Sequence, residues 1–249
     1  MGEHIRVEIC CGSAADVAAA AEGGADRAEL SSCLYFGGLT PSVGTVEAAC
    51  AAGIPVMAMV RPREGGFCYD AEEGRIMARD ARSLVAAGAE GVVFGALTPA
   101  GEIDLELCRR IIEAADGRET VFHRAFDLLE SHWQRSLTQL LELGVTRVLT
   151  SGFAATAPEG AEMLAALRRF AGGGIEILPG SGIRADNALE LCRRTGCHQI
   201  HSSAGQLRRS DPSEGLSQRV SFTPELPPSA GFGRTDRAAV SRLVHEVRR

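Results

Sequence analysis

Several side chains that can transfer protons or hold negative charge stand in or directly after short apolar segments of the sequence. Carboxylates and imidazoles act as general acids and bases, and guanidinium groups stabilise negative charge that develops on a substrate. We expect His123 to act as the acid or base, with Asp127 orienting its ring through Nδ1. Glu8 or Glu29 would be the second proton-transfer group, and Arg61 would hold the developing charge. The candidate catalytic residues are therefore Glu8, Glu29, Arg61, His123, Asp127 and His201.

Small residues with free backbone N–H groups predict an anion site beside these candidates. In β/α barrels, phosphate commonly binds to the loops after the seventh and eighth strands. The glycines could instead only shape tight turns. The expected anion-binding residues are Arg63, Arg124, Ser151, Gly152, Gly180, Ser181, Gly182 and Ser202. This set favours a small phosphorylated or carboxylated metabolite as the ligand.

Sulfur ligands form a third group of candidates. Cys10 ends the first apolar segment, Cys33 follows the second, and Met57 and Met59 lie in the third. Thiolates and thioethers favour Cu(I), although free cysteines and methionines more often pack in a core. The carboxylates and histidines among the catalytic candidates could hold Mg, Mn or Zn. We rank that site below an anion site, because the nearby arginines oppose a cation.

The elements that must position these residues alternate regularly along the chain. Short strands are expected at residues 7–10, 28–31, 56–60, 92–94, 120–123, 147–150, 176–178 and 199–202. Helices are expected between them at residues 13–23, 42–52, 71–87, 104–115, 133–143, 158–170 and 186–195. This alternation predicts an α/β fold, a single-domain (β/α)8 TIM barrel, with a doubly wound open sheet as the alternative. No GxGxxG motif follows the first strand, so no NAD is expected.

A repeated glycine marks four of the expected helix ends. Gly24, Gly88, Gly144 and Gly196 each follow an apolar helical stretch and precede a strand. Glycine adopts the left-handed backbone conformation that ends a helix, and the next residue then packs back on the last turn. The repeat therefore indicates one supersecondary unit used several times.

If the barrel closes, the eighth, first, second and third strands are neighbours. His201, Glu8, Glu29 and Arg61 would then form one arc at the carboxyl ends of the strands, where barrel active sites lie. His123 would face this arc from the opposite wall. A structural ion-pair network that fills the barrel is the alternative interpretation.

The composition of the chain excludes several kinds of partner and reaction. The 249 residues carry a net charge of −6, which favours neither nucleic acid nor an anionic membrane surface as a partner. All 26 basic residues counted as Lys or Arg are arginine, which excludes a Schiff-base lysine, pyridoxal phosphate and a P-loop lysine. The eight cysteines form no CxxC pair, and no secretory signal is visible, so we expect reduced thiols in the cytoplasm.

The last part of the chain departs from the alternation. We expect residues 1–204 to form the barrel and residues 205–249 to add a long loop and a C-terminal helix to the same domain. The loop is expected over residues 205–232 and the helix over 233–249. Such a loop is usually functional, mobile or an oligomer contact, and we expect it to join a homodimer or higher homo-oligomer.

Eight strings, taken in order, make the sequence similar to a known family, the copper homeostasis protein CutC family. They are VEIC at residues 7–10, GGADRAEL at 23–30, GGLTPS at 37–42, VRPR at 60–63, GVVFGAL at 91–97, FHRAFD at 122–127, RVLTSG at 147–152 and PGSGI at 179–183. The resemblance implies a cytoplasmic, oligomeric barrel with a role in copper tolerance and copper-binding cysteines near the mouth. Cys10 matches the first such cysteine. The second departs, because the family string Glu-Leu-Cys-Ser-Gly reads Glu-Leu-Ser-Ser-Cys at residues 29–33, so Cys33 stands two positions later.

Two functions remain open at this point. The resemblance implies a Cu(I)-binding homeostasis protein that uses Cys10 and Cys33. The polar residues alone favour an enzyme of the isomerase, epimerase or lyase type that acts on a small phosphorylated or carboxylated metabolite. The ligand is accordingly either a copper ion or a small anion.

Overall fold

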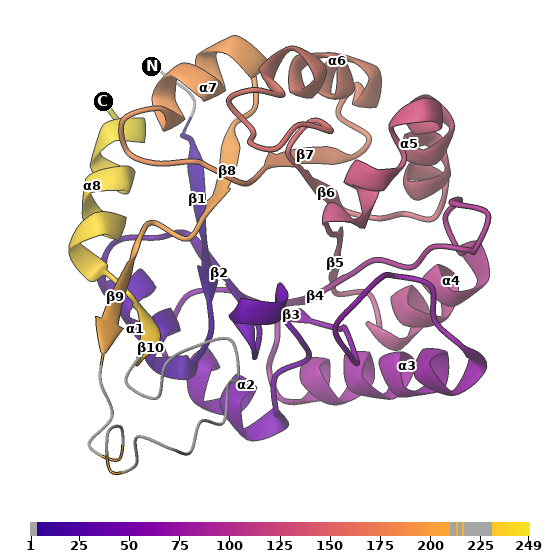
Figure 1. Ribbon diagram of the computed structural model, residues 1–249, viewed down its shortest axis with the longest axis horizontal. Helices are drawn as coiled ribbons and strands as arrows, with labels where there is room; N and C mark the ends of the chain where they lie inside the picture. Colours follow the sequence, from indigo (N-terminus) through magenta and orange to yellow (C-terminus); the bar gives the residue numbers. More distant parts are fainter. Residues whose placement is uncertain (1–3, 210–212, 214–215, 217–230) are drawn as a thin grey trace.

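The strands of the protein form a ring of parallel strands with helices outside it (Figure 1). The computed structural model describes residues 4–209, 213, 216 and 231–249. The strands are β1 (Arg6–Cys11), β2 (Arg27–Leu30), β3 (Val56–Met59), β4 (Gly91–Phe94), β5 (Glu119–Phe122), β6 (Arg147–Thr150), β7 (Glu176–Pro179) and β8 (Gln199–Ser202). They are hydrogen-bonded in the order β7-β6-β5-β4-β3-β2-β1-β8. The predicted β/α barrel is therefore confirmed.

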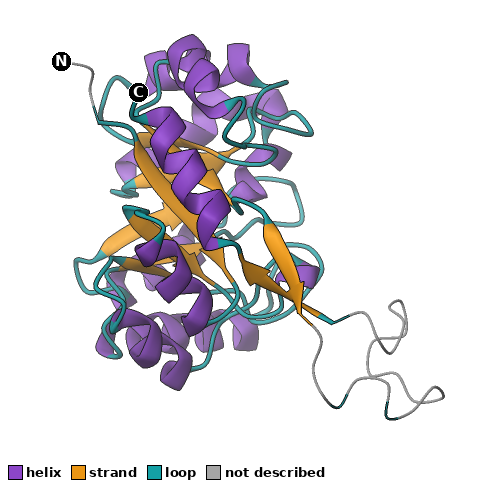
Figure 2. Cartoon of the chain, turned by 90° about the vertical axis from the view of Figure 1, so that its left-hand side faces the viewer, coloured by secondary structure: helices purple, strands orange, loops and turns teal. Residues whose placement is uncertain are grey.

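In the described part of the chain, seven α-helices connect successive strands of the barrel and an eighth lies near the C-terminus, and these helices pack outside the barrel. The helices are α1 (Ala14–Glu22), α2 (Val43–Cys50), α3 (Ala71–Ala86), α4 (Leu105–Ala114), α5 (Trp133–Glu142), α6 (Ala161–Ala171), α7 (Ala188–Thr195) and α8 (Arg237–Val247). In Figure 2, α8 is the helix beside the C-terminus and lies in front of the strands. Short 3-10 helices η1 (Leu34–Phe36), η2 (Arg124–Leu128) and η3 (Glu130–His132) occupy the loops after β2 and β5. Within the described residues, no helix combines the length and apolar character that crossing a membrane requires.

The ring is almost closed by contacts between β7 and β8. One isolated parallel bridge joins Gly180 to His201, and the side-chain amide of Gln199 reaches Ile177 O at 3.5 Å. Inside the barrel, the side chains of several strands form a small apolar cluster of Met57, Met59, Val93, Val121, Leu149 and Leu178. This cluster fills the barrel, so the polar residues beyond it lie on a packed floor.

The four helix-ending glycines adopt the predicted conformation. Gly24, Gly88, Gly144 and Gly196 have φ values of 89°, 105°, 76° and 70°. The following residue then turns back onto the helix; for example, Val145 is buried and its N–H donates to Leu140 O at 3.0 Å. Each glycine therefore reverses the chain from helix to strand without the steric cost that a side chain would add.

The prediction for the C-terminal segment was partly wrong. An antiparallel pair stands there instead: β9 (Gln206–Arg209) lies within the expected loop, and β10 (Phe232–Thr235) spans the end of that loop and the start of the expected helix. The helix α8 begins at Arg237 rather than near residue 233. The rest of the expected loop, apart from residues 205, 213, 216 and 231, lies outside the described residues. Buried Asp16 of α1 anchors β10, because Thr235 N donates to Asp16 Oδ1 at 2.8 Å. Neither short strand shows the apolar alternation that would have predicted it.

Candidate active site at the mouth of the barrel

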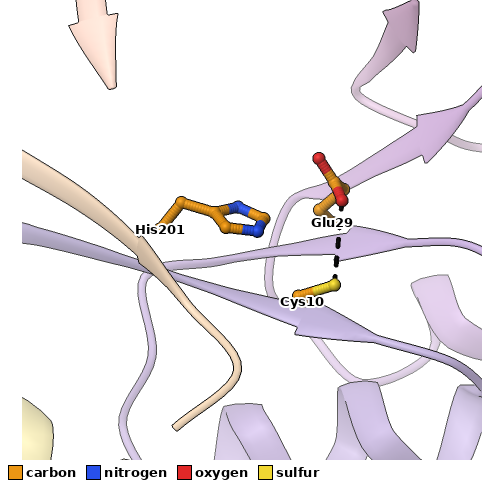
Figure 3. Close-up of side chains that lie close together, drawn as sticks. All are labelled: Cys10, Glu29 and His201. Carbon is orange, nitrogen blue, oxygen red and sulfur yellow. Dashed lines mark hydrogen bonds between the residues drawn. The ribbon is translucent and has the colours of Figure 1, made fainter. Parts of the chain in front are cut away.

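The strand register brings three reactive side chains together at the carboxyl end of the barrel. Cys10 of β1 lies opposite Glu29 of β2, and His201 of β8 lies on the other side of β1, opposite Glu8. One ligand atom from each of Cys10, Glu29 and His201 lies within 4.8 Å of the other two. Figure 3 shows these three side chains directed toward a common point. Because residues two apart on a strand face the same side, Glu8 and Cys10 both point into the barrel.

A cavity of about 210 Å³ opens over this group. It brings together four of the six candidate catalytic residues, from strands on opposite walls. Its lining residues are Cys10, Glu29, Ser31, Leu34, Gly37, Met59, Arg61, Phe67, His123, Arg124, Leu149 and His201. The cavity therefore combines an apolar floor with convergent polar groups, which is the usual composition of a small-molecule site.

Four buried polar atoms on the cavity-lining residues have no hydrogen-bond partner within the described part of the chain. They are Glu29 Oε2, Ser31 Oγ, Arg61 Nε and His123 Nε2. A buried polar atom without a partner costs free energy, and native proteins rarely retain one without a reason. Their grouping around one cavity indicates a place where a polar ligand would supply the missing hydrogen bonds.

His201 is held in its protonated form by its neighbours. Its Nδ1 lies 2.8 Å from Glu8 Oε1, so the ring donates its Nδ1 proton to that carboxylate. Burial alone would lower the pKa of His201, but Glu29, Cys10 and Glu8 outweigh burial and raise this pKa well above its usual value. The ring thus presents an N–H from its other nitrogen, Nε2, to the Cys10 and Glu29 side of the cavity.

Glu8 acts on His201 rather than on a ligand. Burial would raise the pKa of Glu8, but Arg27 and His201 lower it to about 2. Its second oxygen accepts from Arg27 Nε, and Glu8 is not among the described residues that line the cavity. Both oxygens of Glu8 are therefore engaged by Arg27 and His201, and a part for Glu8 in proton transfer to a substrate stays a prediction.

The pKa values of Glu29 and Cys10 are raised, in contrast to that of Glu8. Burial is the largest influence on both groups, and it raises the pKa of the Glu29 carboxyl and of the Cys10 thiol. The thiol donates to Glu29 Oε1, with Sγ 3.8 Å from the oxygen. Glu29 is thus a carboxyl whose proton affinity is increased, as a general base or acid near neutral pH requires.

His123 is neutral and carries its proton on Nε2. Its Nδ1 accepts from Ala125 N at 3.1 Å, which leaves Nε2 as the donor. Burial and the positive charge of Arg61 lower the pKa of His123 to about 3. The cavity therefore has a neutral imidazole on one wall and an imidazolium, His201, on the other.

The expected role of Asp127 was wrong. Asp127 does not orient His123, whose Nδ1 is engaged by the backbone. Its carboxylate instead accepts from Arg124 Nε at 2.7 Å and from Ser151 N at 3.1 Å, and it also accepts from Thr150 Oγ1. Asp127 therefore ties the loop after β5 to the end of β6 and fixes Arg124 at the cavity.

Arg61 lines the cavity but has little donor capacity left. Its two terminal nitrogens donate to the carbonyl oxygens of Phe36, Gly38 and Gly65 at 2.7–3.0 Å. Only Nε remains without a partner among the described residues. Arg61 thus shapes the loop after β2 and offers a ligand one N–H rather than a bidentate fork.

A second, larger cavity of about 850 Å³ adjoins the first one and shares Cys10, Arg124 and His201 with it. It contains the loops after β7 and β8. Its lining residues are Cys10, Arg124, Ser181, Gly182, Ile183, Arg184, Ala185, Asp186, His201, Ser202, Ser203, Ala204, Gly205, Ala239, Arg242 and Leu243. Of the expected anion-binding residues, this cavity thus includes Arg124, Ser181, Gly182 and Ser202.

The other expected anion-binding residues have their donors engaged elsewhere. The N–H groups of Ser151, Gly152 and Gly180 donate to Asp127, Thr150 Oγ1 and Thr150 O, respectively. Arg63 pairs with Glu73 and donates to Cys68 O at 2.8 Å. The fold itself therefore uses these four donors, and the sequence does not show which donors are used in this way; their part in anion binding stays a prediction.

Cys33 is exposed and is not part of the Cys10, Glu29 and His201 group. It takes a left-handed conformation, with φ of 49°, just before η1. The thiol, imidazole and carboxylate that do converge form a mixed donor set, which suits Zn²⁺ or copper better than Mg²⁺ or Ca²⁺. The residues present thus fit one metal ion, with a single cysteine rather than two.

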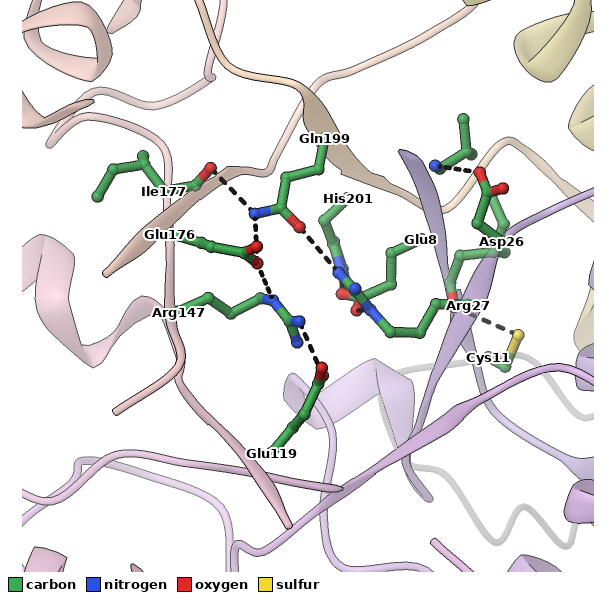
Figure 4. Close-up of polar contacts among 12 residues, drawn as sticks. Glu8, Cys11, Asp26, Arg27, Glu119, Arg147, Glu176, Ile177, Gln199 and His201 are labelled. Atoms are coloured by element: carbon green, nitrogen blue, oxygen red, sulfur yellow. Dashed lines mark hydrogen bonds and ion pairs between the residues drawn. The ribbon is translucent and has the colours of Figure 1, made fainter. Parts of the chain in front are cut away.

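A polar layer at the opposite end of the barrel was missed in the sequence. Figure 4 shows Arg27, Gln199, Glu176, Arg147 and Glu119 linked in one chain that begins at Glu8. Arg27 Nη2 donates to Gln199 Oε1 at 3.1 Å, and Gln199 Nε2 donates to Glu176 Oε2 at 3.1 Å. Each of the five is the first residue of its strand, so a polar residue opening an apolar strand was the available signal. The layer reaches His201 through Arg27, which donates to Glu8, and through Glu8, which accepts from His201.

Comparisons with known proteins agree with this architecture. The sequence profile of the CutC family matches residues 5–206. A family protein CutC from Treponema denticola is 44% identical over 227 residues, which cover 91% of this chain and 92% of that protein. A family protein CutC from Caulobacter vibrioides is 41% identical over 250 residues, covering 100% of this chain and 99% of the relative.

A solved structure from Streptococcus agalactiae, which bears the name copper homeostasis protein CutC, is similar in both fold and sequence. It superposes with a TM-score of 0.77 and 35% identity, over 80% of this chain and 98% of that chain. The profile match and the two relatives extend over most of the sequence, well beyond the mouth residues. The chain belongs to the CutC family.

Proposed function

We propose that the mouth of the barrel is an acid–base active site for a small polar metabolite, with chemistry of the isomerase, epimerase or lyase type. The observation that carries this proposal is the set of unpartnered buried atoms around one cavity, between two histidines held in opposite protonation states. Environments that push the pKa values of neighbouring groups apart are typical of assigned acid and base roles.

The side chains suggest a division of roles. Glu29 would take a proton from carbon or oxygen, and His201, within 4.8 Å of it, would return one. Neutral His123 would donate its Nε2 proton in a hydrogen bond to a substrate carbonyl and stabilise the negative charge that develops there. Glu8 and Arg27 are positioning residues, since they keep His201 charged without lining the cavity.

The larger cavity would hold an anionic group of the same substrate. It shares Cys10, Arg124 and His201 with the smaller one, so a single molecule could occupy both. Arg124 and the loops after β7 and β8 offer positive charge and backbone donors to a phosphate or carboxylate. This arrangement favours substrates in which the anionic group lies at one end and a carbonyl or hydroxyl at the other.

The proposal is tested by ligand binding with matched variants. We expect one or more of a panel of sugar phosphates and small carboxylates to raise the thermal midpoint of the wild-type protein. Glu29→Gln and His123→Gln should remove this response, whereas Cys33→Ser, at an exposed position outside the cavity, should retain it. A wild-type protein that responds to no member of the panel, or a response that both cavity variants retain, would contradict the proposal.

A second candidate function is Cu(I) binding in a cytoplasmic copper homeostasis role. Membership of the CutC family supports it, and the convergence of Cys10, Glu29 and His201 is the specific observation in its favour. Met59, which lines the same cavity, adds a soft thioether. In this case copper is the cargo, and Glu8 orients His201 as carboxylates commonly orient metal-ligating histidines.

Competition titration against a Cu(I) chelator under reducing conditions distinguishes the two candidates. The copper candidate predicts one Cu(I) per chain, lost in Cys10→Ser and retained in Cys33→Ser. Equal Cu(I) affinity in the wild-type protein and Cys10→Ser would exclude the mouth as the copper site. Loss of Cu(I) only in Cys33→Ser would place copper on the exposed loop.

A further inference from the structure

The opposite end of the barrel carries a cavity that the proposed function does not use. Its volume is about 690 Å³, and it lies where β1, β7 and β8 begin and where α6 ends. The side chains that line it include Arg6, Arg168 and Arg169, together with Glu176 and Gln199 of the polar layer. A volume of this size suits a drug-sized or nucleotide-sized molecule.

Positive charge dominates this cavity in a chain whose net charge is −6. Glu176 is the one carboxylate among its described lining residues, and that carboxylate is already neutralised by buried Arg147, whose Nε lies 3.1 Å from Glu176 Oε2. Gln199 donates to the same oxygen. The three cavity arginines therefore face the cavity without a free acid among the described lining residues to balance them.

Two of these arginines make no side-chain hydrogen bond with the described residues around them. Arg168 donates to His198 Nε2 at 3.1 Å and borders Gly196, so it has a packing role. The guanidinium groups of Arg6 and Arg169 make no hydrogen bond within the described residues, although the positive charge of Arg6 is close enough to help lower the pKa of Glu176. Arg169 lies in the last turn of α6, where a cation also interacts favourably with the helix dipole, but Arg6 opens a strand and has no such partner.

We propose that this cavity is a second binding site, separate from the mouth, for a small molecule with at least two negative charges, of the phosphate or diphosphate class. Arg6 and Arg169 would bind the anion directly, because guanidinium groups match phosphate oxygens in pairs. The site lies at the amino ends of the strands, whereas both cavities of the candidate active site lie at the carboxyl ends. Its ligand is thus not the substrate of the mouth.

Pyrophosphate binding, measured by calorimetry at constant ionic strength, tests the site. The wild-type protein should bind pyrophosphate, and Arg6→Gln and Arg169→Gln should each weaken binding by about tenfold. Arg184→Gln, in the larger mouth cavity, is the matched control and should leave this affinity unchanged.

Absence of binding to the wild-type protein overturns the proposal. An affinity that falls only in Arg184→Gln also overturns it, because the anion would then occupy the mouth. Both arginines are exposed, so we expect their substitution to leave the folded chain intact, and circular dichroism of each variant checks this. The result is independent of the acid–base proposal, whose variants all lie at the other end of the barrel.

Discussion

Replacing Glu8 by glutamine should destabilise the protein far more than removing a surface charge. Glu8 and Arg27 have exposed side-chain fractions of only 1% and 7%, and His201 relies on the other oxygen of Glu8. Glutamine keeps the shape of the side chain but leaves a buried guanidinium and a buried imidazolium without their counter-charge. Removing one partner of a buried pair typically costs about 3–5 kcal/mol.

The pKa of Glu8 gives a second route to the same magnitude. A carboxyl whose pKa is lowered from 4.5 to about 2 by folding contributes about 3 kcal/mol to the free energy of unfolding. Because the folded pKa is the lower one, this contribution is complete above pH 4.5 and is lost as the pH falls toward 2. The difference between the wild-type protein and Glu8→Gln should therefore be largest near neutral pH and should fade in acid.

Urea unfolding at several pH values measures this difference. The matched control is Glu72→Gln, which removes an exposed ion pair with Arg75, with side-chain exposures of 64% and 58%. Such surface pairs contribute about 0–1 kcal/mol. If Glu8→Gln and Glu72→Gln cost the same at neutral pH, or if the cost of Glu8→Gln persists unchanged in acid, the ion-pair account of the mouth is refuted.

Three further changes follow from the same geometry. Asp127→Asn should lower the free energy of unfolding by about 1.5–3 kcal/mol, measured by urea denaturation, because the charged acceptor of Arg124 is lost; an unchanged midpoint would contradict this role. Gly95→Ala should displace His123, since an added Cβ would lie 2.3 Å from His123 Cε1. The free energy of unfolding should then fall by about 1–3 kcal/mol and ligand binding should be lost; retained binding would count against His123. Ser31→Cys adds a second thiol to the cavity and should raise the Cu(I) affinity at least about tenfold if the mouth binds copper. The gain should be larger at higher pH, because burial raises the pKa of the Cys10 thiol. Chelator competition measures the affinity, and no gain would argue against copper at the mouth.

The sequence predicted the barrel because its signals are local. The left-handed glycines Gly24, Gly88, Gly144 and Gly196 mark where helices end, and apolar segments mark the strands. The arc of Glu29 and His201 followed from barrel closure alone, since strand order decides which strand ends are neighbours.

The errors concern groups whose partners depend on side-chain geometry. Asp127 was expected to orient His123 through Nδ1, but His123 Nδ1 accepts a hydrogen bond from a backbone N–H instead. Ser151 and Gly180 were assigned to an anion, but the N–H of Ser151 donates to Asp127 in the loop after β5, and the N–H of Gly180 donates to Thr150 O of β6. No local pattern reveals whether the fold has consumed a donor, so such residues require coordinates.

The polar layer of Arg27, Glu119 and Arg147 was missed for a different reason. Each residue opens its strand, and a charged residue at that position is usually a solvated strand end. Here the barrel turns Arg27 and Arg147 inward, where Arg27 pairs with Glu8 and buried Arg147 pairs with the partly exposed Glu119. Counting opposite charges at the starts of neighbouring strands would have indicated the layer.

The protonation states of His201 and His123 test the central claim most directly. Imidazole nitrogen shifts, measured by NMR on 15N-histidine-labelled protein between about pH 6 and 8, report both rings without any knowledge of the substrate. We predict that His201 remains an imidazolium over this range and that His123 remains neutral with its proton on Nε2. Glu8→Gln should lower the pKa of His201 and leave His123 unchanged. Two histidines that both titrate near their ordinary value would contradict a preorganised acid–base site at the mouth.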